Sequence, residues 1–252
     1  MVESVFNHRS IRKYKSQKID DKALDLILRA ASRASTTGNM QVYSIVVTKD
    51  EAIKEKLWEA HFKQDMVKQA PVVLTFLADF NRFNKWCEQN DAIPGYDNFL
   101  SFYTASIDAL LAAQNAAIQA EDLGLGICYL GTTTYMAQKI IETLNLPKGV
   151  VPVTTLVIGY PAELPGLTDR LPMEAIIHKE TYQDFEASSI EKLYYDKDHS
   201  ELTKKLLEEN QKETLAQIFT DNRYTKKDNV TFSKLLLEVL KRQGFMNNEM
   251  EE

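Results

Sequence analysis

The chain has 252 residues, 44% of them hydrophobic, so it can form one large domain or two small ones with a sizeable core. Its formal net charge of -6 argues against nucleic acid as the main partner, because phosphate binding requires a basic face. The two cysteines, Cys87 and Cys128, have no CxxC spacing, which favours a reducing compartment over a disulfide-stabilised fold. The sequence shows neither a secretory signal nor an apolar stretch of membrane-spanning length. We therefore expect a cytoplasmic protein without a membrane partner.

Helix and strand patterns alternate in the first hundred residues. Residues 20–31 place apolar side chains at i, i+3, i+4 and i+7 behind Asp20, which predicts an amphipathic helix with an aspartate cap. The loop STTGN precedes VYSIVVT, a β-branched strand, and Asp50 is expected to cap a second helix. After a proline, VVLTFLAD is apolar throughout, which predicts a strand buried on both faces. Residues 81–98 are polar and mixed, and we expect an excursion from the core there.

The next stretch contains the longest helical pattern of the chain. Residues 101–123 are rich in alanine and apolar on more than one side, which predicts a helix buried between other elements or at a subunit interface. GICYLG follows as a short strand, Met136–Leu144 as a helix, and VVPVTTLVIGYP as the last strong strand. Because helices separate the strands, the fold class is α+β or α/β with a mixed sheet.

The composition changes after Pro172. Residues 186–252 are dense in Lys, Glu and Asp, with helical patches near 201–219 and 232–242. Between these patches TDNRYTKKDN is polar and predicted to be mobile, and the terminal NNEMEE is predicted to fray. We therefore expect a core over residues 1–185 and a charged helical extension over residues 186–252 that packs on the core or on a partner subunit.

Several common reaction centres are missing from the sequence. It contains neither a GxSxG nucleophile elbow nor a GxxxxGK[ST] phosphate loop. The four histidines are scattered, and none lies at metal-ligand spacing from a cysteine or another histidine, so we expect no metal. The glycines in GLGICYLG do not match GxGxxG, and they lead from a helix into a strand, the reverse of a dinucleotide-binding loop.

A cationic cluster, HRSIR, lies ahead of the first clear helix. His8, Arg9 and Arg12 supply three cations or potential cations, and Ser10 adds a hydroxyl. Arginine offers a planar fork that matches phosphate, so the cluster is a candidate phosphate site, with a solvated basic patch as the alternative. The proline-containing loop GYPAELPGLTDRLP places Arg170 after a strand, and a rigidly held cation there favours ligand binding.

Taken together, these segments resemble the nitroreductase family, most closely its oxygen-insensitive NADPH nitroreductases and related flavin reductases. The matching segments cover nearly the whole chain in order: HRSIRKY, ASTTGNMQ, QDMVKQAP, LADFNR, AQNAAIQAEDLGLGICYLG, GYPAELPGLTDRLP, TDNR and KRQGF. The resemblance implies an α+β fold with a mixed β-sheet flanked by helices. It also implies a homodimer that holds FMN at the subunit interface.

The resemblance also implies which residues form the site. Arg12 would lie at the pyrimidine end of the flavin and stabilise negative charge there, which makes it the candidate catalytic residue. Arg223, in TDNR, resembles a residue that meets the NADPH phosphate, although a solvated charge is the alternative for a lone arginine in a lysine-rich loop. The other residues expected to hold FMN, from its phosphate to its ring, are His8, Arg9, Ser10, Arg170, Thr36, Gln64, Tyr129, Leu130 and Gly131.

Two positions depart from the family pattern. Thr168 stands where a lysine two residues before the arginine of the RLP segment is common, so one phosphate cation is missing. Thr132 stands where the strand end often has a second glycine, so a side chain narrows the approach to the ring. Both departures bear on cofactor affinity and on the shape of the substrate pocket.

The expected function is an FMN-dependent NAD(P)H oxidoreductase that reduces nitroaromatics, quinones or flavins by a ping-pong mechanism. Because flavin carries the reactive chemistry, the absence of an evident nucleophile or general base is consistent with this function. Its partners would be NADPH or NADH and a small electron-poor aromatic acceptor. The alternatives are a flavin-binding storage or sensor protein without efficient turnover, and an interaction protein in which HRSIR is only a surface patch.

Overall fold

The structure is a computed structural model that describes residues 2–248. The last four residues of the predicted frayed tail, 249–252, lie outside the described residues. The chain separates into two compact units, which we describe one at a time. The first comprises Met1–Gly166 and Phe232–Glu252, and the second comprises Leu167–Thr231. The sequence had placed a single boundary between residues 185 and 186.

The first unit is built on a four-stranded sheet in the order β1-β2-β4-β3. All three pairs of neighbouring strands are antiparallel, and among residues 2–248 the one parallel pairing is an isolated bridge between Ser10 and Ile127. The α+β class is therefore confirmed, and the mixed character predicted for the sheet is confined to that bridge. The strands are β1 (Tyr43–Thr48), β2 (Val72–Asp79), β3 (Gly126–Leu130) and β4 (Val150–Gly159).

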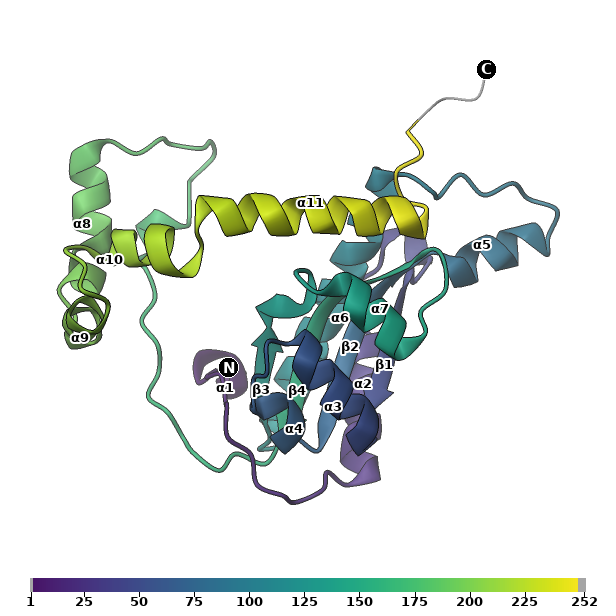
Figure 1. Cartoon of the computed structure of the whole chain (residues 1–252), viewed down its shortest axis with the longest axis horizontal. Coiled ribbons are helices and arrows are strands. Elements are labelled where there is room, and N and C mark those ends of the chain that lie inside the picture. The colour runs from purple at the N-terminus through teal and green to yellow at the C-terminus, as the bar shows by residue number, and fades with distance from the viewer. Residues whose placement is uncertain (1, 249–252) are drawn as a thin grey trace. The chain divides into compact units, whose positions relative to one another are not determined.

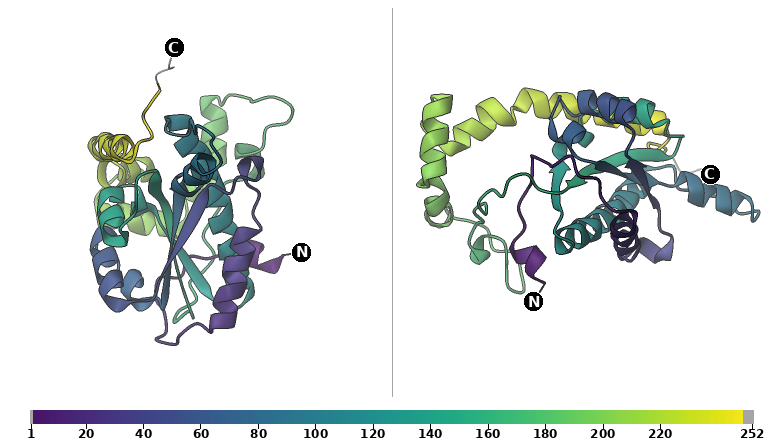
Figure 2. Two further views of the ribbon diagram at one scale, coloured as in Figure 1. Left: turned by 90° about the vertical axis from the view of Figure 1, so that its right-hand side faces the viewer. Right: turned by 90° about the horizontal axis from the view of Figure 1, so that it is seen from below.

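Helices cover both faces of this sheet (Figures 1 and 2). Side chains alternate along a strand, so Leu74 and Phe76 of β2 face one helical layer and Val73 faces the other. All eight residues of β2 are buried, as expected for a strand covered on both sides. The first layer consists of α2 (Asp21–Ser32) and α6 (Phe99–Asp122). The second consists of α3 (Glu51–Ala60), α4 (Met66–Gln69) and α7 (Ala137–Leu144).

Helix α6 turns its small side chains inward and its large ones outward. The buried side that packs on the sheet and α2 is formed by Ala109, Ala112, Ala113, Ala116, Ala117 and Ala120. Alanine allows two helices and a sheet to approach closely, which explains why this face needs no large side chain. Beyond the exposed first residue of the helix, Phe99, the exposed apolar residues are Leu100, Tyr103, Ile107, Leu110 and Leu111, named below the α6 apolar stripe. The alanine side of α6 is therefore buried, as predicted, whereas the α6 apolar stripe is exposed to solvent in the single chain.

The first unit also contains helix caps and several further helical elements. Asp50 caps α3 by accepting the amide of Ile53 over 2.9 Å, as predicted, whereas Asp20 occupies the cap position of α2 without a side-chain bond. The predicted polar excursion contains a helix, α5 (Asn81–Glu88). The short elements are α1 (Glu3–Phe6), η1 (Thr37–Asn39) and η2 (Gly131–Thr133). The long helix α11 (Lys226–Gln243) also belongs to this unit from Phe232 onward.

The second unit is helical. The segment predicted to be mobile, TDNRYTKKDN, runs from the π-helical turn η4 into the first turn of α11. The elements of this unit are η3 (Met173–Ala175), α8 (Ala187–Asp198), α9 (Glu201–Asn210), α10 (Leu215–Gln217), η4 (Ile218–Arg223) and the beginning of α11. The second unit therefore begins in the proline-containing loop, and the chain returns to the first unit within α11.

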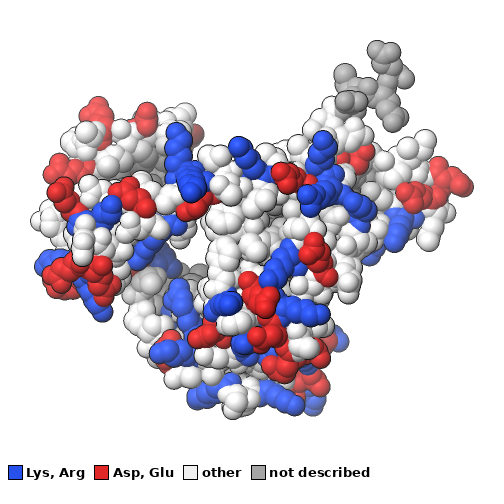
Figure 3. All heavy atoms as spheres, in the orientation of Figure 1, with Lys and Arg blue, Asp and Glu red and all other residues white. Residues whose placement is uncertain are grey.

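Charges of both signs are interspersed on the face of the protein shown in Figure 3. None of the helices in residues 2–248 is long and apolar enough to cross a membrane.

The contact between Gly126 and Ile11 provides a test of the fold. A Cβ on Gly126 would lie 2.5 Å from Cγ1 and 2.8 Å from Cβ of Ile11, which is closer than carbon atoms can approach. We expect Gly126→Ala to lower the free energy of unfolding by about 1–3 kcal/mol, the usual cost of overpacking. Urea denaturation of the flavin-free protein measures this change. Gly95→Ala is the matched control, because a Cβ there meets nothing within 4 Å. Equal stability of the two variants would contradict the contact.

Candidate functional site

The HRSIR segment lies against β3 in the first unit. The amide of Ile11 donates to the carbonyl of Ile127 over 2.8 Å, and Ser10 forms the parallel bridge to the same residue. Ile11 is buried, and because side chains alternate along an extended chain, Ser10 and Arg12 point to the opposite side. Beyond Ile11 the chain bonds to the segment that follows β4: the carbonyl of Lys13 accepts the amide of Ala162, and the amide of Lys15 donates to the carbonyl of Tyr160, each over 2.9 Å. Because the end of β4 pairs with the amino end of β3, the backbone of Arg12 lies toward that end. The charge of Arg12 acts on Cys128, where it opposes the burial that raises the pKa of the thiol.

The three cationic residues of this segment differ in their partners. Nδ1 of His8 lies 2.7 Å from a carboxylate oxygen of Glu121, at the end of α6. Arg9 donates to the carbonyls of Asn7 and Pro165 over 3.2 and 3.0 Å. Arg12 forms no hydrogen bond or ion pair with any residue that the structure describes. Its guanidinium is therefore the cation most available to an anionic ligand.

The carboxyl end of β3 presents open backbone. Gly131 is exposed, and a Cβ added to it would meet nothing within 4 Å. Leu130 is buried, and burial raises the pKa of the half-buried Tyr129, with the negative charge of Glu121 acting in the same direction. A flat ligand can therefore approach the main chain at Gly131 without displacing a side chain.

The loop after α3 contributes Gln64 to the same end of β3. His61, at the carboxyl end of α3, is fully buried, and its Nδ1 lies 2.9 Å from the hydroxyl of Thr132. Nε2 of Gln64 donates to that hydroxyl over 3.3 Å. Burial lowers the pKa of His61 to about 4, so its imidazole is neutral at neutral pH.

Thr36 lies in the loop before η1, and this loop is attached to α6 at a different point from His8. Its neighbour Thr37 is fixed by Asp108, which accepts the amide of Thr37 over 2.9 Å. Asp108 and Glu121, the partner of His8, are separated by about 20 Å along the helix at 1.5 Å per residue. Within one chain, Thr36 and His8 are thus tied to distant points of α6, and the role of Thr36 toward a flavin stays a prediction.

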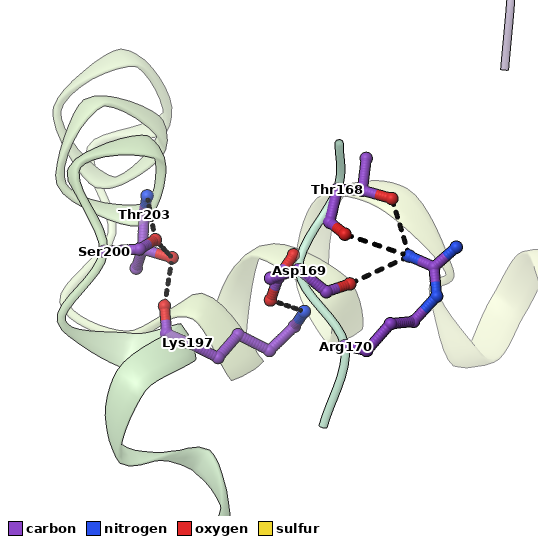
Figure 4. A network of polar contacts seen from close by, with 6 residues as sticks. All are labelled: Thr168, Asp169, Arg170, Lys197, Ser200 and Thr203. Carbon is purple, nitrogen blue, oxygen red and sulfur yellow. Dashed lines mark hydrogen bonds and ion pairs between the residues drawn. The ribbon is translucent and has the colours of Figure 1, made fainter. Parts of the chain in front are cut away.

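Arg170 and Arg223 belong to the second unit, where each is held locally. Nη1 of Arg170 donates to the hydroxyl of Thr168 over 2.6 Å and to the carbonyl of Asp169 over 2.9 Å (Figure 4). The carboxylate of Asp169 pairs with Lys197 of α8 over 2.6 Å in the same network. The guanidinium of Arg223 lies 5.8 Å from the centre of the Phe219 ring. The predicted contacts of both arginines with phosphate groups stay predictions.

The sequence did not identify two buried polar residues near these segments. Asp108 is an isolated carboxylate within the alanine-rich part of α6, and that isolation is the signal that could have revealed it. Lys54 is buried and donates to the carbonyls of Lys68 and Ala70 over 3.1 and 3.0 Å, which ties α3 to the end of α4, the helix that follows the loop carrying Gln64. Within residues 2–248, no group of three histidine, cysteine or acidic side chains is arranged to hold a metal ion.

Comparison with known proteins supports a single family. A model of the nitroreductase family matches residues 5–160. An FMN reductase [NAD(P)H] of Bacillus subtilis is 36% identical over 249 residues, covering 97% of each chain. An oxygen-insensitive NADPH nitroreductase of Salmonella typhimurium is 36% identical over 182 residues, covering 72% of this chain and 74% of that protein.

Solved structures agree with these matches over the whole chain. A structure from Bacteroides fragilis is 56% identical with a TM-score of 0.96, covering 97% of this chain and 100% of that one. A nitroreductase of Bacillus subtilis is 30% identical with a TM-score of 0.87, covering 98% and 99%. An NADPH:FMN oxidoreductase of Vibrio harveyi in complex with NAD+ is 26% identical with a TM-score of 0.83, again covering 98% and 99%.

The buried imidazole of His61 predicts a pH dependence of stability. The pKa of His61 is about 4 in the folded chain and about 6.5 when unfolded, so below pH 6.5 the unfolded state binds the additional proton. Folding is therefore destabilised as the pH falls from 6.5 toward 4, by about 2 kcal/mol at pH 5.0 relative to pH 7.5. Urea denaturation at both pH values should show this loss in the unmodified chain.

His61→Asn is the matched control for this measurement. It removes the titrating group and retains a polar side chain, so its loss of stability between the two pH values should be smaller by the same amount. Equal pH dependence in the two proteins would mean that His61 is not held neutral in the folded chain.

Proposed function

Since the chain belongs to the nitroreductase family, we propose that it is an FMN-dependent oxidoreductase that uses NADPH or NADH to reduce small electron-poor acceptors. The relatives named as an FMN reductase and as a nitroreductase support this activity. The observation that carries the proposal is Arg12, an exposed arginine without a protein partner among the described residues, in a segment paired to β3, the strand that ends in the open backbone at Gly131.

The residues of the HRSIR segment and of the carboxyl end of β3 suit FMN by their chemistry. FMN combines a flat ring with a flexible polyol and a phosphate, so its site needs an open flat surface, neutral donors and cations. The open backbone at Gly131 is the flat surface, because a Cβ there would meet nothing. Ser10 supplies a hydroxyl, and Arg9 and Arg12 supply guanidinium groups that match phosphate or ring oxygens. All of these residues belong to the first unit.

When bound, FMN would accept a hydride from the nicotinamide and pass its electrons to the acceptor. The chain itself has to bind, orient and supply charge. Arg12 places a fixed positive charge beside the ring, where it favours the electron-rich form of the cofactor. His8, Arg9 and Ser10 bind the phosphate end, and the pairing of His8 with Glu121 fixes the imidazole in position. Tyr129, Leu130 and Gly131 contribute main chain along the ring.

A second copy of the chain would complete the site. The α6 apolar stripe leaves five large side chains exposed, and an apolar surface of this kind favours association. Thr36 is tied to a point of α6 about 20 Å from the partner of His8, so one chain does not bring the two residues together. In a homodimer with the stripe at its interface, Thr36 of one chain contacts the flavin held by the other.

The second unit supplies cations for the phosphates in this proposal. Arg170 binds the FMN phosphate, with Thr168 orienting its guanidinium through the 2.6 Å hydrogen bond. Arg223 binds the additional phosphate that distinguishes NADPH from NADH. Nicotinamide and acceptor occupy the same ring face in turn, which produces ping-pong kinetics. Nitroaromatics, quinones and free flavins are flat and electron-poor, and they are the acceptors that such a face admits.

Anaerobic stopped-flow reduction tests this function. Purified protein loaded with FMN should be bleached by NADPH or NADH and should regain its colour on addition of a quinone or a nitroaromatic compound. Initial rates at varied donor and acceptor concentrations should give parallel double-reciprocal lines, because one site serves both substrates. Flavin-loaded protein that neither dinucleotide reduces would instead identify a storage or sensor protein. Protein that binds no FMN would leave HRSIR as a surface patch.

Arg12→Ala tests the residue on which the proposal depends. Loss of its charge should slow flavin reduction by about tenfold or more, since charge stabilisation at a developing anion is commonly worth that much. Lys15→Ala removes a nearby exposed cation and serves as the control. If the two variants reduce FMN at the same rate, Arg12 does not act at the ring.

Leu110→Asp tests the shared site. A buried aspartate in the centre of the α6 apolar stripe should separate the chains, halve the mass in sedimentation and weaken FMN binding by at least about tenfold. Leu26→Asp on α2 is the control, since Leu26 and Leu110 are 48% and 49% exposed in the single chain. A monomeric Leu110→Asp variant that retains FMN would refute the interfacial placement.

A further inference from the structure

His61, Gln64 and Thr132 form one hydrogen-bonded group in the first unit, and the roles assigned above do not account for it. Nδ1 of His61 lies 2.9 Å from Oγ1 of Thr132, and Nε2 of Gln64 donates to the same oxygen over 3.3 Å. The hydroxyl exists only because the residue after Gly131 is a threonine. Three separate segments, the end of α3, the loop that follows it and η2, are therefore joined at one side chain.

The group fixes the orientation of the Gln64 amide. Its nitrogen donates both to the carbonyl of His61 over 3.0 Å and to the hydroxyl of Thr132, so its two hydrogens are both used. A flipped amide would place its oxygen against the carbonyl of His61, and two acceptors repel each other. Oε1 of Gln64 consequently points away from both partners, and no described residue donates to it.

The loop that carries Gln64 is rigidly held. Phe62 and Lys63 both adopt left-handed backbone conformations, with φ values of 54° and 58°, which cost free energy in residues with a side chain. The amide of Lys63 donates back to α3 over 2.8 Å, and buried Lys54 of α3 binds the carbonyls of Lys68 and Ala70 at the end of α4, the helix that follows the loop. Strain of this kind persists where the surrounding contacts impose it, and it is concentrated at ligand sites.

His61 is suited to a purely orienting role. It is fully buried and neutral, and it offers Thr132 a partner that does not change its protonation state around neutral pH. It cannot exchange protons with a ligand in solvent, because none of its side chain is exposed. Gln64 is partly exposed, so it is the member of the group that a ligand can reach.

We propose that His61 and Thr132 are positioning residues that hold the Gln64 amide with Oε1 directed as an acceptor toward an N–H donor of the flavin ring. The proposal rests on the proposed function, since it takes FMN as the ligand. Thr132 immediately follows Gly131, where open backbone receives the ring, so the ring is the part of FMN nearest to this group. The threonine thus orients the amide by a hydrogen bond, at a position where the family pattern has a glycine.

A double-mutant cycle on FMN affinity tests this proposal, with the dissociation constant measured by quenching of FMN fluorescence. Thr132→Val removes the hydroxyl at nearly constant volume and should weaken binding by about 3- to 10-fold, the value of one neutral hydrogen bond. Thr132→Ser retains the hydroxyl and should bind like the unmodified chain. In a Gln64→Leu background, Thr132→Val should cause no further loss, because Thr132 acts through Gln64.

Two results would overturn the proposal. One is unchanged affinity in Thr132→Val. The other is an equal loss of affinity in the presence and absence of Gln64, which would mean that Thr132 acts on the flavin or the fold by itself. Thermal unfolding of each flavin-free variant identifies any loss of structure, and Thr132→Ala replaces the valine variant if that one fails to fold. Failure of the unmodified chain to bind FMN would instead overturn the proposed function, and this inference with it.

Discussion

The pairing of residues 10 and 11 with β3 is the constraint on which the candidate site depends. It attaches the segment that carries Arg12 to a strand more than a hundred residues away. Tyr14 adds a second anchor, since its buried hydroxyl donates to the carbonyl of Ile11 over 2.7 Å. Gly126 is required because any side chain there would occupy the space of Ile11. The backbone of Arg12 is thus fixed on both sides before a ligand arrives, which reduces the cost of binding.

Helix α6 links this constraint to the rest of the fold. Its alanine face allows the sheet and α2 to approach closely, and its two buried or half-buried carboxylates orient residues at both ends of the candidate site. Glu121 fixes His8, whereas Asp108 fixes the loop of Thr36. The opposite face of the helix exposes the apolar stripe. A single helix therefore sets the spacing of the site residues and offers the surface through which a second chain would complete the site.

The sequence predicted those elements that carry a local signal, such as the uniformly apolar β2 and the Asp50 cap of α3. It did not predict α5 or α8, which lie in polar and charged stretches. It could not decide which side of α6 faces the core, because alanines and larger apolar residues produce the same helical period. It also gave no signal for the burial of His61, since burial of a lone histidine depends on tertiary packing. The left-handed conformations of Phe62 and Lys63 and the return of α11 to the first unit have no local sequence signal either.

The two departures from the family pattern have a common chemical consequence. Thr168 replaces a cation, and its hydroxyl accepts a hydrogen bond from Arg170 within the second unit. Thr132 replaces a glycine, and its hydroxyl accepts a hydrogen bond from Gln64 within the first. Position 168 thus lacks the positive charge of the family pattern, and position 132 lacks its open space. Each position has instead a hydroxyl that orients a neighbouring polar side chain. Orientation lowers the conformational entropy lost when a ligand binds, so a well-oriented arginine and amide offset part of what the missing lysine and the narrower approach cost.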